Sequence, residues 1–112
     1  MLPPTLPPRL QAALGDFAAG LRSRLGERVE GVRLFGSWAR GEARPDSDVD
    51  VWVLVDRFDP LTRRLPFDLA VEVFLRHGVD LSPTVMEQAE WRLLRDRERR
   101  IARDIEAQGV PL

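Results

Sequence analysis

The sequence predicts a small α/β (or α+β) domain in which a mixed sheet of three to four strands is packed by helices. Three observations predict this class: an apolar row at helical spacing near the start, an apolar β-branched run in the middle, and helical and strand-like segments that alternate around them. The 112 residues suffice for one small core, so we expect a single domain over 1–112.

The first predicted helix follows a proline-rich start, 1–8, which we expect to be irregular. Its apolar residues recur every three or four positions, as in an amphipathic helix, at Leu10, Leu14, Phe17, Leu21 and Leu25. Gly26 stands where this helix should end. Alternating apolar and polar residues predict a strand over 29–35, which Gly36 closes before one helical turn over 37–40.

The clearest strand spans 48–55, where valine, tryptophan and leucine dominate. Such β-branched and aromatic density is typical of a central strand that is buried on both faces. A helix should then begin at Asp59-Pro60 and end at Gly78, with Pro66 dividing it into a short turn and a main helix.

A third strand is predicted from Val79 to about Met86. Pro83 places its later half at an edge of the sheet, because proline cannot donate a hydrogen bond to a neighbouring strand. The alternative interpretation of this end is a helix start, with Thr84 and Glu87 as a capping box.

The C-terminal segment, 87–108, has the period of a helix. One face carries the apolar residues Trp91, Leu94, Ile101 and Ile105. Six arginines and six acidic residues balance within the segment, so we expect a solvated helix laced with salt bridges rather than a nucleic-acid-binding arm.

Composition excludes several classes of protein and site. The formal net charge of -1 argues against a protein that coats nucleic acid or an anionic membrane. Cysteine is absent and histidine occurs once, so a bound metal would need oxygen ligands. All seventeen basic residues are arginine, which excludes lysine Schiff-base chemistry. No leader and no apolar run of bilayer length is visible, and we expect a soluble, cytoplasmic protein.

Two carboxylates, Asp48 and Asp50, interrupt the apolar strand. Residues separated by one position on a strand point to the same face, with Cα atoms about 6.6 to 6.8 Å apart. Two like charges on an apolar strand are costly to desolvate unless something neutralises them, and bridging divalent cations would do so. A turn cap would explain Asp48 alone, but exposure explains Asp50 poorly because its neighbours Val51 and Trp52 favour burial.

Further candidate site residues lie before and after this pair. Gly36-Ser37 ends the first strand, where a glycine lets an anion approach the backbone and the serine offers a hydroxyl and an amide. Arg40 and Arg44 lie in the same connection and could pair with phosphates. Asp80 would complete a three-carboxylate cluster if the third strand lies beside the second, and otherwise it is a solvent-facing aspartate.

Three motifs together resemble those of the minimal nucleotidyltransferases, the smallest members of the DNA polymerase β-like superfamily that includes kanamycin nucleotidyltransferase. The motifs are Gly36-Ser37-Trp38-Ala39-Arg40-Gly41, Ser47-Asp48-Val49-Asp50-Val51 and Val79-Asp80-Leu81. The family pattern is Gly-Ser, ten residues, then Asp-x-Asp, with a third aspartate on a later strand, and the chain has this spacing. Trp38 departs from it, because many relatives carry arginine there, and this leaves open which arginine contacts phosphate.

The resemblance implies a nucleotidyltransferase fold like the polymerase β palm, with ATP and two Mg²⁺ ions and the transfer of a nucleotidyl group. Carried over by position, Gly36 and Ser37 would hold the β- and γ-phosphates. Asp48 and Asp50 would bind both metal ions, and Asp80 would complete the second metal site and help deprotonate the attacking hydroxyl.

The resemblance also implies a partner. Family members of this size are commonly encoded beside a helical HEPN-domain protein, in pairs that resemble toxin–antitoxin systems. The chain would then be an antitoxin that transfers AMP to a tyrosine hydroxyl of a HEPN toxin, and we expect a homo- or hetero-oligomer. Two alternatives stay open: a binding module that neutralises its partner without chemistry, and a transferase that acts on a small molecule such as an antibiotic.

Overall fold

The computed structural model describes residues 6–97 and 99–112, and it confirms the α/β class. Residues 1–5 of the start that we predicted to be irregular lie outside the described residues, and the last residue of that segment, Pro8, already begins α1. The elements, in chain order, are α1 (Pro8–Leu25), the 3₁₀ turn η1 (Gly26–Arg28), β1 (Val29–Phe35), α2 (Ser37–Arg40), β2 (Val49–Val55), α3 (Pro60–His77), β3 (Leu81–Glu87), α4 (Gln88–Asp96), α5 (Arg100–Gln108) and β4 (Val110–Pro111).

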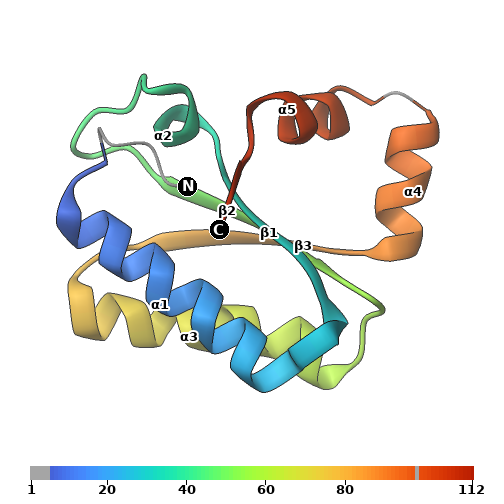
Figure 1. Cartoon of the computed structure of the whole chain (residues 1–112), viewed down its shortest axis with the longest axis horizontal. Helices are drawn as coiled ribbons and strands as arrows, with labels where there is room; N and C mark the ends of the chain where they lie inside the picture. The colour runs from blue at the N-terminus through green and yellow to red at the C-terminus, as the bar shows by residue number, and fades with distance from the viewer. Residues whose placement is uncertain (1–5, 98) are drawn as a thin grey trace.

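Four strands form one mixed sheet in the order β3-β2-β1-β4. β1 pairs antiparallel with β2 and with β4, whereas β3 runs parallel to β2. Helices α1 and α3 cover one face, and α4 and α5 lie over the other (Figure 1). β2 is therefore a central strand and β3, which contains Pro83, is an edge strand, as the sequence predicted.

The pleat of β2 separates two apolar clusters. Its four valines, Val49, Val51, Val53 and Val55, are buried in the cluster formed with α1 and α3. Its other face carries Trp52 and Leu54, which pack with residues of β3, α4 and α5, namely Met86, Trp91, Ala102 and Ile105. The ring centroids of the two tryptophans lie 4.8 Å apart, so both indoles serve as core packing.

Helix α3 begins at a capping box. The Asp59 carboxylate accepts the Thr62 backbone N–H, and the Asp59 N–H donates to the Thr62 hydroxyl, both at 2.9 Å. The Arg28 guanidinium lies 2.6 Å from the Asp59 carboxylate. The Thr62 N–H, followed by Arg28, lowers the pKa of Asp59 to about 2. These contacts connect the start of α3 to the turn η1, which precedes β1.

The prediction that Pro66 divides this helix is wrong. Helix α3 runs from Pro60 to His77 with Pro66 inside it, and the ring of Pro66 is buried. A proline removes one backbone hydrogen bond of a helix. Here the buried neighbours Leu65 and Leu69 anchor the helix to the core on both sides of the missing bond, and such packing outweighs local propensity.

The alternative capping box at Thr84 and Glu87 is also wrong. Both residues lie in β3, whose full length pairs with β2. The Glu87 carboxylate instead accepts the backbone N–H of Phe58 at 2.9 Å, in the connection that follows β2. Tertiary contacts therefore use the acidic side chain that the local pattern would assign to a helix cap.

The C-terminal segment forms two helices rather than the single predicted one. Helix α4 ends at Asp96, and α5 begins at Arg100. One straight helix over 87–108 would be about 33 Å long, whereas the longest extent of the whole molecule is 35 Å. The turn between the helices lets Trp91 of α4 and Ile105 of α5 both reach the sheet.

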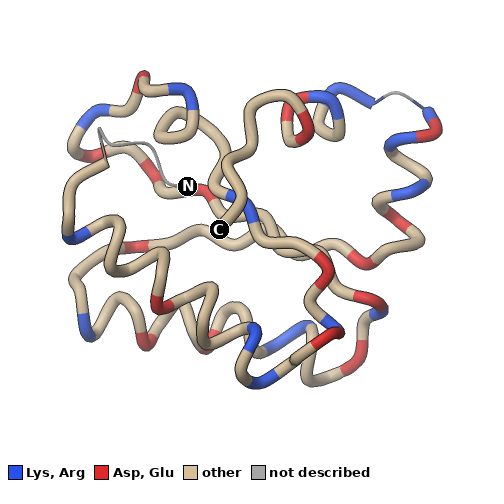
Figure 2. Tube along the Cα trace, viewed as in Figure 1, with Lys and Arg blue, Asp and Glu red and all other residues tan. Residues whose placement is uncertain are grey.

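Charged residues of both signs are interspersed along the chain, including α4 and α5 (Figure 2). The Arg95 guanidinium lies 3.3 Å from the Glu106 carboxylate, in agreement with the predicted salt-bridged segment. Within the described ranges, no helix is long and apolar enough to cross a membrane.

Candidate active site

Two neighbouring parallel strands position the three predicted catalytic aspartates. Asp50 lies in β2, and Asp48 and Asp80 each stand one residue before a strand, β2 and β3 respectively. In the register of this pair Val49 lies opposite Leu81. Extending the register by one residue brings Asp48 beside Asp80.

The exposed Asp48 and Asp80 line the same cleft, of about 440 Å³, at the end of the sheet. Val49 and Leu81, which follow them, are buried in the cluster under α1 and α3. Because side chains alternate along a strand, Asp50 lies on the opposite face from Val49, the face that α4 and α5 partly cover. Asp48 and Asp80 stand just outside their strands, and the start of α1 forms part of the cleft that they line. The strand order therefore agrees with the prediction that Asp80 lies near the Asp48–Asp50 pair.

Asp50 has the electrostatic surroundings of a cation ligand. Partial burial raises the pKa of this carboxyl, the negative charge of Asp48 raises it further, and Arg40 opposes both effects. A carboxylate pair that is crowded in this way gains from any cation between its members. The ionised form of Asp50 is thus disfavoured in the protein alone.

The Gly36 loop lies directly against Asp50. Gly36 has φ 74° and ψ -157°, a conformation that is essentially restricted to glycine. A Cβ atom at this position would collide with Oδ2 of Asp50. The glycine is therefore required twice, for its backbone conformation and for the close approach of the loop to the carboxylate. The sequence predicted that an anion could approach the backbone at Gly36, but it gave no indication of the contact with Asp50.

The structure separates the two predicted phosphate-binding arginines. Ser37 begins α2 next to Gly36, and Arg40 ends this short helix. Arg40 lines a cleft together with Gly36, and its Nε donates to Glu42 at 3.1 Å. Arg44 lies outside that cleft, in the exposed loop before β2, where its backbone N–H donates to the Ser47 hydroxyl at 2.8 Å. Arg40 is therefore the better-placed candidate for a phosphate contact.

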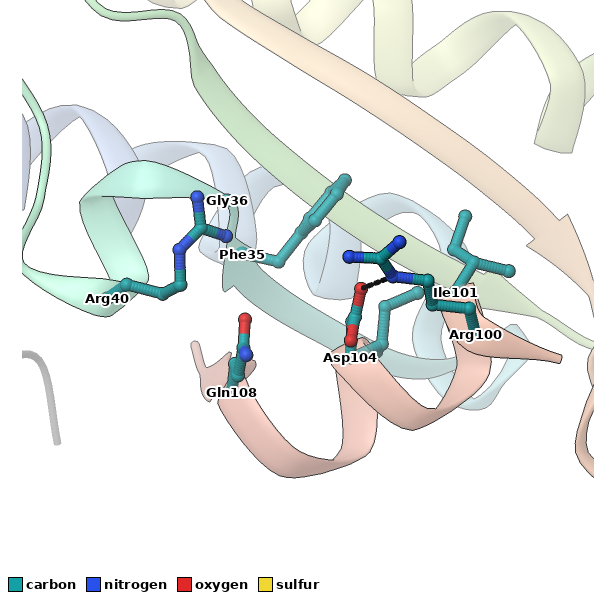
Figure 3. Close-up of a pocket in the computed structure, with 8 residues that line it drawn as sticks. Phe35, Gly36, Arg40, Arg100, Ile101, Asp104 and Gln108 are labelled. Atoms are coloured by element: carbon teal, nitrogen blue, oxygen red, sulfur yellow. Dashed lines mark ion pairs between the residues drawn. The ribbon is translucent and has the colours of Figure 1, made fainter. Parts of the chain in front are cut away.

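The cleft beside Gly36 has a wall that the sequence did not reveal. It measures about 420 Å³ and is lined by Phe35, Gly36, Arg40, Arg100, Ile101, Asp104, Ile105 and Gln108 (Figure 3). Five of these eight residues belong to α5. Phe35 pairs with Asp50 across β1 and β2, so the cleft borders Asp50.

Long-range contacts hold α5 in this place. Strand β4, immediately after the helix, pairs with β1 so that Arg33 lies opposite Pro111. The Arg33 side chain donates to the backbone carbonyl of Ile105 at 3.1 Å, and the Leu112 N–H donates to the Val32 carbonyl at 2.9 Å. A two-residue strand leaves almost no signal in a sequence. The position of the α5 residues in the cleft could therefore not be predicted.

Trp38 has a structural role in this fold. Its indole N–H donates to the Ser47 carbonyl at 3.2 Å, and its ring packs against the cluster under α1 and α3. It thereby ties α2 to the loop that leads to Asp48. At the position where many relatives of the family carry arginine, this chain therefore has a core-packing residue.

The donor set near Asp48 and Asp50 fits Mg²⁺, which prefers carboxylate oxygens and retains several waters. Among residues 6–97 and 99–112, no three acidic or histidine side chains stand close enough together to hold one metal ion. The assignment of Asp48, Asp50 and Asp80 as metal ligands therefore stays a prediction.

The part of the chain that contains this loop and these aspartates matches a known protein family. The family model described as Nucleotidyltransferase domain matches residues 16–105. The chain belongs to this nucleotidyltransferase family. The match confirms the resemblance that the three motifs predicted and establishes the enzyme class.

Relatives of this nucleotidyltransferase are protein adenylyltransferases. The protein adenylyltransferase MntA of Thermococcus cleftensis is 43% identical over 72 residues, which make up 64% of this chain and 71% of MntA. MJ0604 of Methanocaldococcus jannaschii, classed among the protein adenylyltransferases, is 32% identical over 76 residues, 67% of this chain and 71% of that protein.

Two solved structures share the fold. A toxin–antitoxin structure with AMP-PNP aligns with a TM-score of 0.55 and 22% identity over 88% of this chain and 70% of that chain. A mutant of the MntA–HpeT toxin–antitoxin pair aligns with a TM-score of 0.53 and 23% identity over 88% and 69%. These alignments confirm the predicted nucleotidyltransferase fold.

Proposed function

We propose that this nucleotidyltransferase transfers AMP from ATP to a hydroxyl group of a partner protein, a HEPN-type toxin, and thereby acts as the antitoxin. The observation that carries the proposal is the close approach of the Gly36 loop to Asp50, beside Asp48. A loop that admits an anion and a crowded carboxylate pair are the two parts that nucleotidyl transfer requires.

The donor nucleotide would lie between these parts. Gly36 and Ser37 would hold the β- and γ-phosphates, with Arg40 as a guanidinium partner and Arg44 as a more distant one. When bound, two Mg²⁺ ions would neutralise the charge that builds on the phosphates, held by Asp48 and Asp50 and, for the second ion, by Asp80 as well. All of these ligands are oxygens, as a chain without cysteine requires.

The strand order supports an in-line displacement. Asp80 precedes β3, Asp50 lies in β2 with Asp48 just before the strand, and Gly36 follows β1, so the pair lies between the other two groups across the sheet. The acceptor oxygen would attack the α-phosphorus from the side of Asp80, which takes its proton. The bond from the α-phosphorus to the bridging oxygen then breaks, and pyrophosphate leaves on the side of Gly36.

The relatives support a protein as the acceptor. MntA is named a protein adenylyltransferase, and the structures that share the fold come from toxin–antitoxin pairs. That the toxin is of the HEPN type is what the resemblance to minimal nucleotidyltransferases implies. We place the reaction in the cytoplasm, where ATP is available.

Labelled transfer tests the proposal. The purified protein is incubated with Mg²⁺, ATP labelled at the α-phosphate and the product of the neighbouring gene. The wild type should label that partner and relieve its toxicity, and the double variant Asp48→Asn/Asp50→Asn should do neither. The matched control, Asp68→Asn/Glu72→Gln, also removes two carboxylates, but from the exposed surface of α3, and it should label normally.

The same experiment separates the alternatives. Neutralisation without labelling, retained in the double aspartate variant, would favour a binding module that works without chemistry. Labelling of a small-molecule acceptor but of no protein would favour an antibiotic-type transferase. Either outcome would contradict the proposed protein adenylylation.

A further inference from the structure

The cleft beside Gly36 has two distinct ends (Figure 3). Arg40 and Gln108 lie at one end, Arg100 and Asp104 lie toward the other, and Phe35 stands between them. Arg100 and Gln108 are eight positions apart on α5, which corresponds to about 12 Å along a helix axis. The cleft is thus elongated, with α5 as one long wall.

The end near Gly36 and Arg40 is the phosphate end under the proposed function, on which this inference rests. Phe35 lies directly opposite Asp50 in the antiparallel pair of β1 and β2, and directly opposite side chains share a face about 4.5–5.5 Å apart at Cβ. An ATP molecule with its α-phosphate at Asp50 would therefore direct its ribose and base across Phe35 toward α5.

The far end of the cleft offers a hydrogen-bond donor beside an acceptor. The Arg100 Nε lies 3.8 Å from Oδ2 of Asp104, which is too long for a hydrogen bond. The Arg100 side chain is 95% exposed and that of Asp104 is 50% exposed, so both groups are open to a ligand. Adenine carries the matching pair on one edge, an amino donor beside a ring-nitrogen acceptor.

We propose that α5 selects the base of the donor nucleotide. Asp104 accepts a hydrogen bond from the exocyclic amine of adenine, Arg100 donates to the neighbouring ring nitrogen, and Phe35 with Ile101 supplies the apolar surface against the ring. The residues that distinguish ATP from other nucleotides then come from the C-terminal helix, apart from the motifs that bind phosphate and metal.

Binding of ATP and inosine triphosphate to the whole protein tests the proposal. Inosine triphosphate keeps the phosphates, the ribose and the shape of the base, but it carries an oxygen in place of the amine and a hydrogen on the neighbouring ring nitrogen. The donor and the acceptor on this edge are therefore exchanged. Titration calorimetry with Mg²⁺ should give wild-type binding of ATP about tenfold tighter than that of inosine triphosphate. Asp104→Ala and Arg100→Ala should each reduce this ratio toward one.

The chain offers a matched control in an ion pair between α4 and α5. Glu106 has a side chain that is 50% exposed and paired with Arg95 at 3.3 Å, outside the cleft. Glu106→Ala and Arg95→Ala should therefore keep the wild-type ratio. A wild type without preference between the two nucleotides, or variants at Asp104 and Arg100 that keep the preference, would overturn the inference. Failure of the wild type to bind any nucleoside triphosphate would instead overturn the proposed function.

Discussion

Replacing Gly36 by alanine tests the geometry on which the site depends. The substitution has two separable effects: the backbone conformation disfavours any side chain, and the new Cβ collides with Oδ2 of Asp50. Backbone strain of this kind amounts to about 1–3 kcal/mol. The collision involves the end of a side chain that can rotate away, so it should add little to the loss of stability but should displace Asp50.

Gly41 provides the matched control because it also has a positive φ, 73°, but lies in open surroundings. In the described part of the chain, no atom beyond its immediate neighbours lies within 4 Å of where the Cβ of an alanine would stand. Gly41→Ala should cost about 1–2 kcal/mol from the left-handed backbone alone. The two variants should thus differ in unfolding free energy, measured in urea, by about 2 kcal/mol at most.

Their nucleotide binding should differ far more. Gly36→Ala moves a predicted metal ligand, so its affinity for ATP in the presence of Mg²⁺, measured by calorimetry, should fall at least about tenfold, equivalent to about 1.4 kcal/mol. Gly41→Ala should bind as the wild type does. Wild-type affinity in Gly36→Ala would refute the claim that this loop and Asp50 form one site.

Three further predictions follow from contacts outside that loop. Asp50→Asn should raise Tm in the presence of EDTA, because it removes a partly buried charge that faces Asp48, and an unchanged or lower Tm would contradict this explanation. The wild type should lose stability as the pH falls from about 4 to about 2, because the pKa of Asp59 is about 2 in the folded protein and 3.8 in the unfolded chain. Asp59→Ala should show a smaller decrease of Tm over this pH range. Arg33→Ala removes the bond to the Ile105 carbonyl and the guanidinium 5.7 Å from the Trp52 ring, so it should cost about 1–2 kcal/mol in urea and accelerate amide exchange in α5. Unchanged exchange in α5 would show that this contact does not hold the helix.

Local patterns were sufficient to predict the elements that carry the motifs. The strand over 29–35 and the turn over 37–40 match β1 and α2, because alternation and the flanking glycines are properties of neighbouring residues. The spacing of Asp48 and Asp50 could likewise be converted into a shared face of one strand.

Features decided by distant contacts could not be predicted in this way. Pro66 stays within a helix because residues far away in the sequence bury its neighbours. The wall of the cleft depends on β4, whose two residues find their partner in β1. Such pairings are properties of the folded chain, and the helical period of 87–108 gave no indication of where the helix breaks.

The alternation of β2 between a valine row and an aspartate–tryptophan row also limits how this strand can pair. A slip of one residue would turn Asp50 into the valine cluster and turn the valines toward α5, since every side chain would change face. The free-energy penalty of burying that charge excludes the shifted pairing. The register that buries the core is therefore also the register that orients Asp50 toward the Gly36 loop, and substitutions in the valine row can impair the site without touching it.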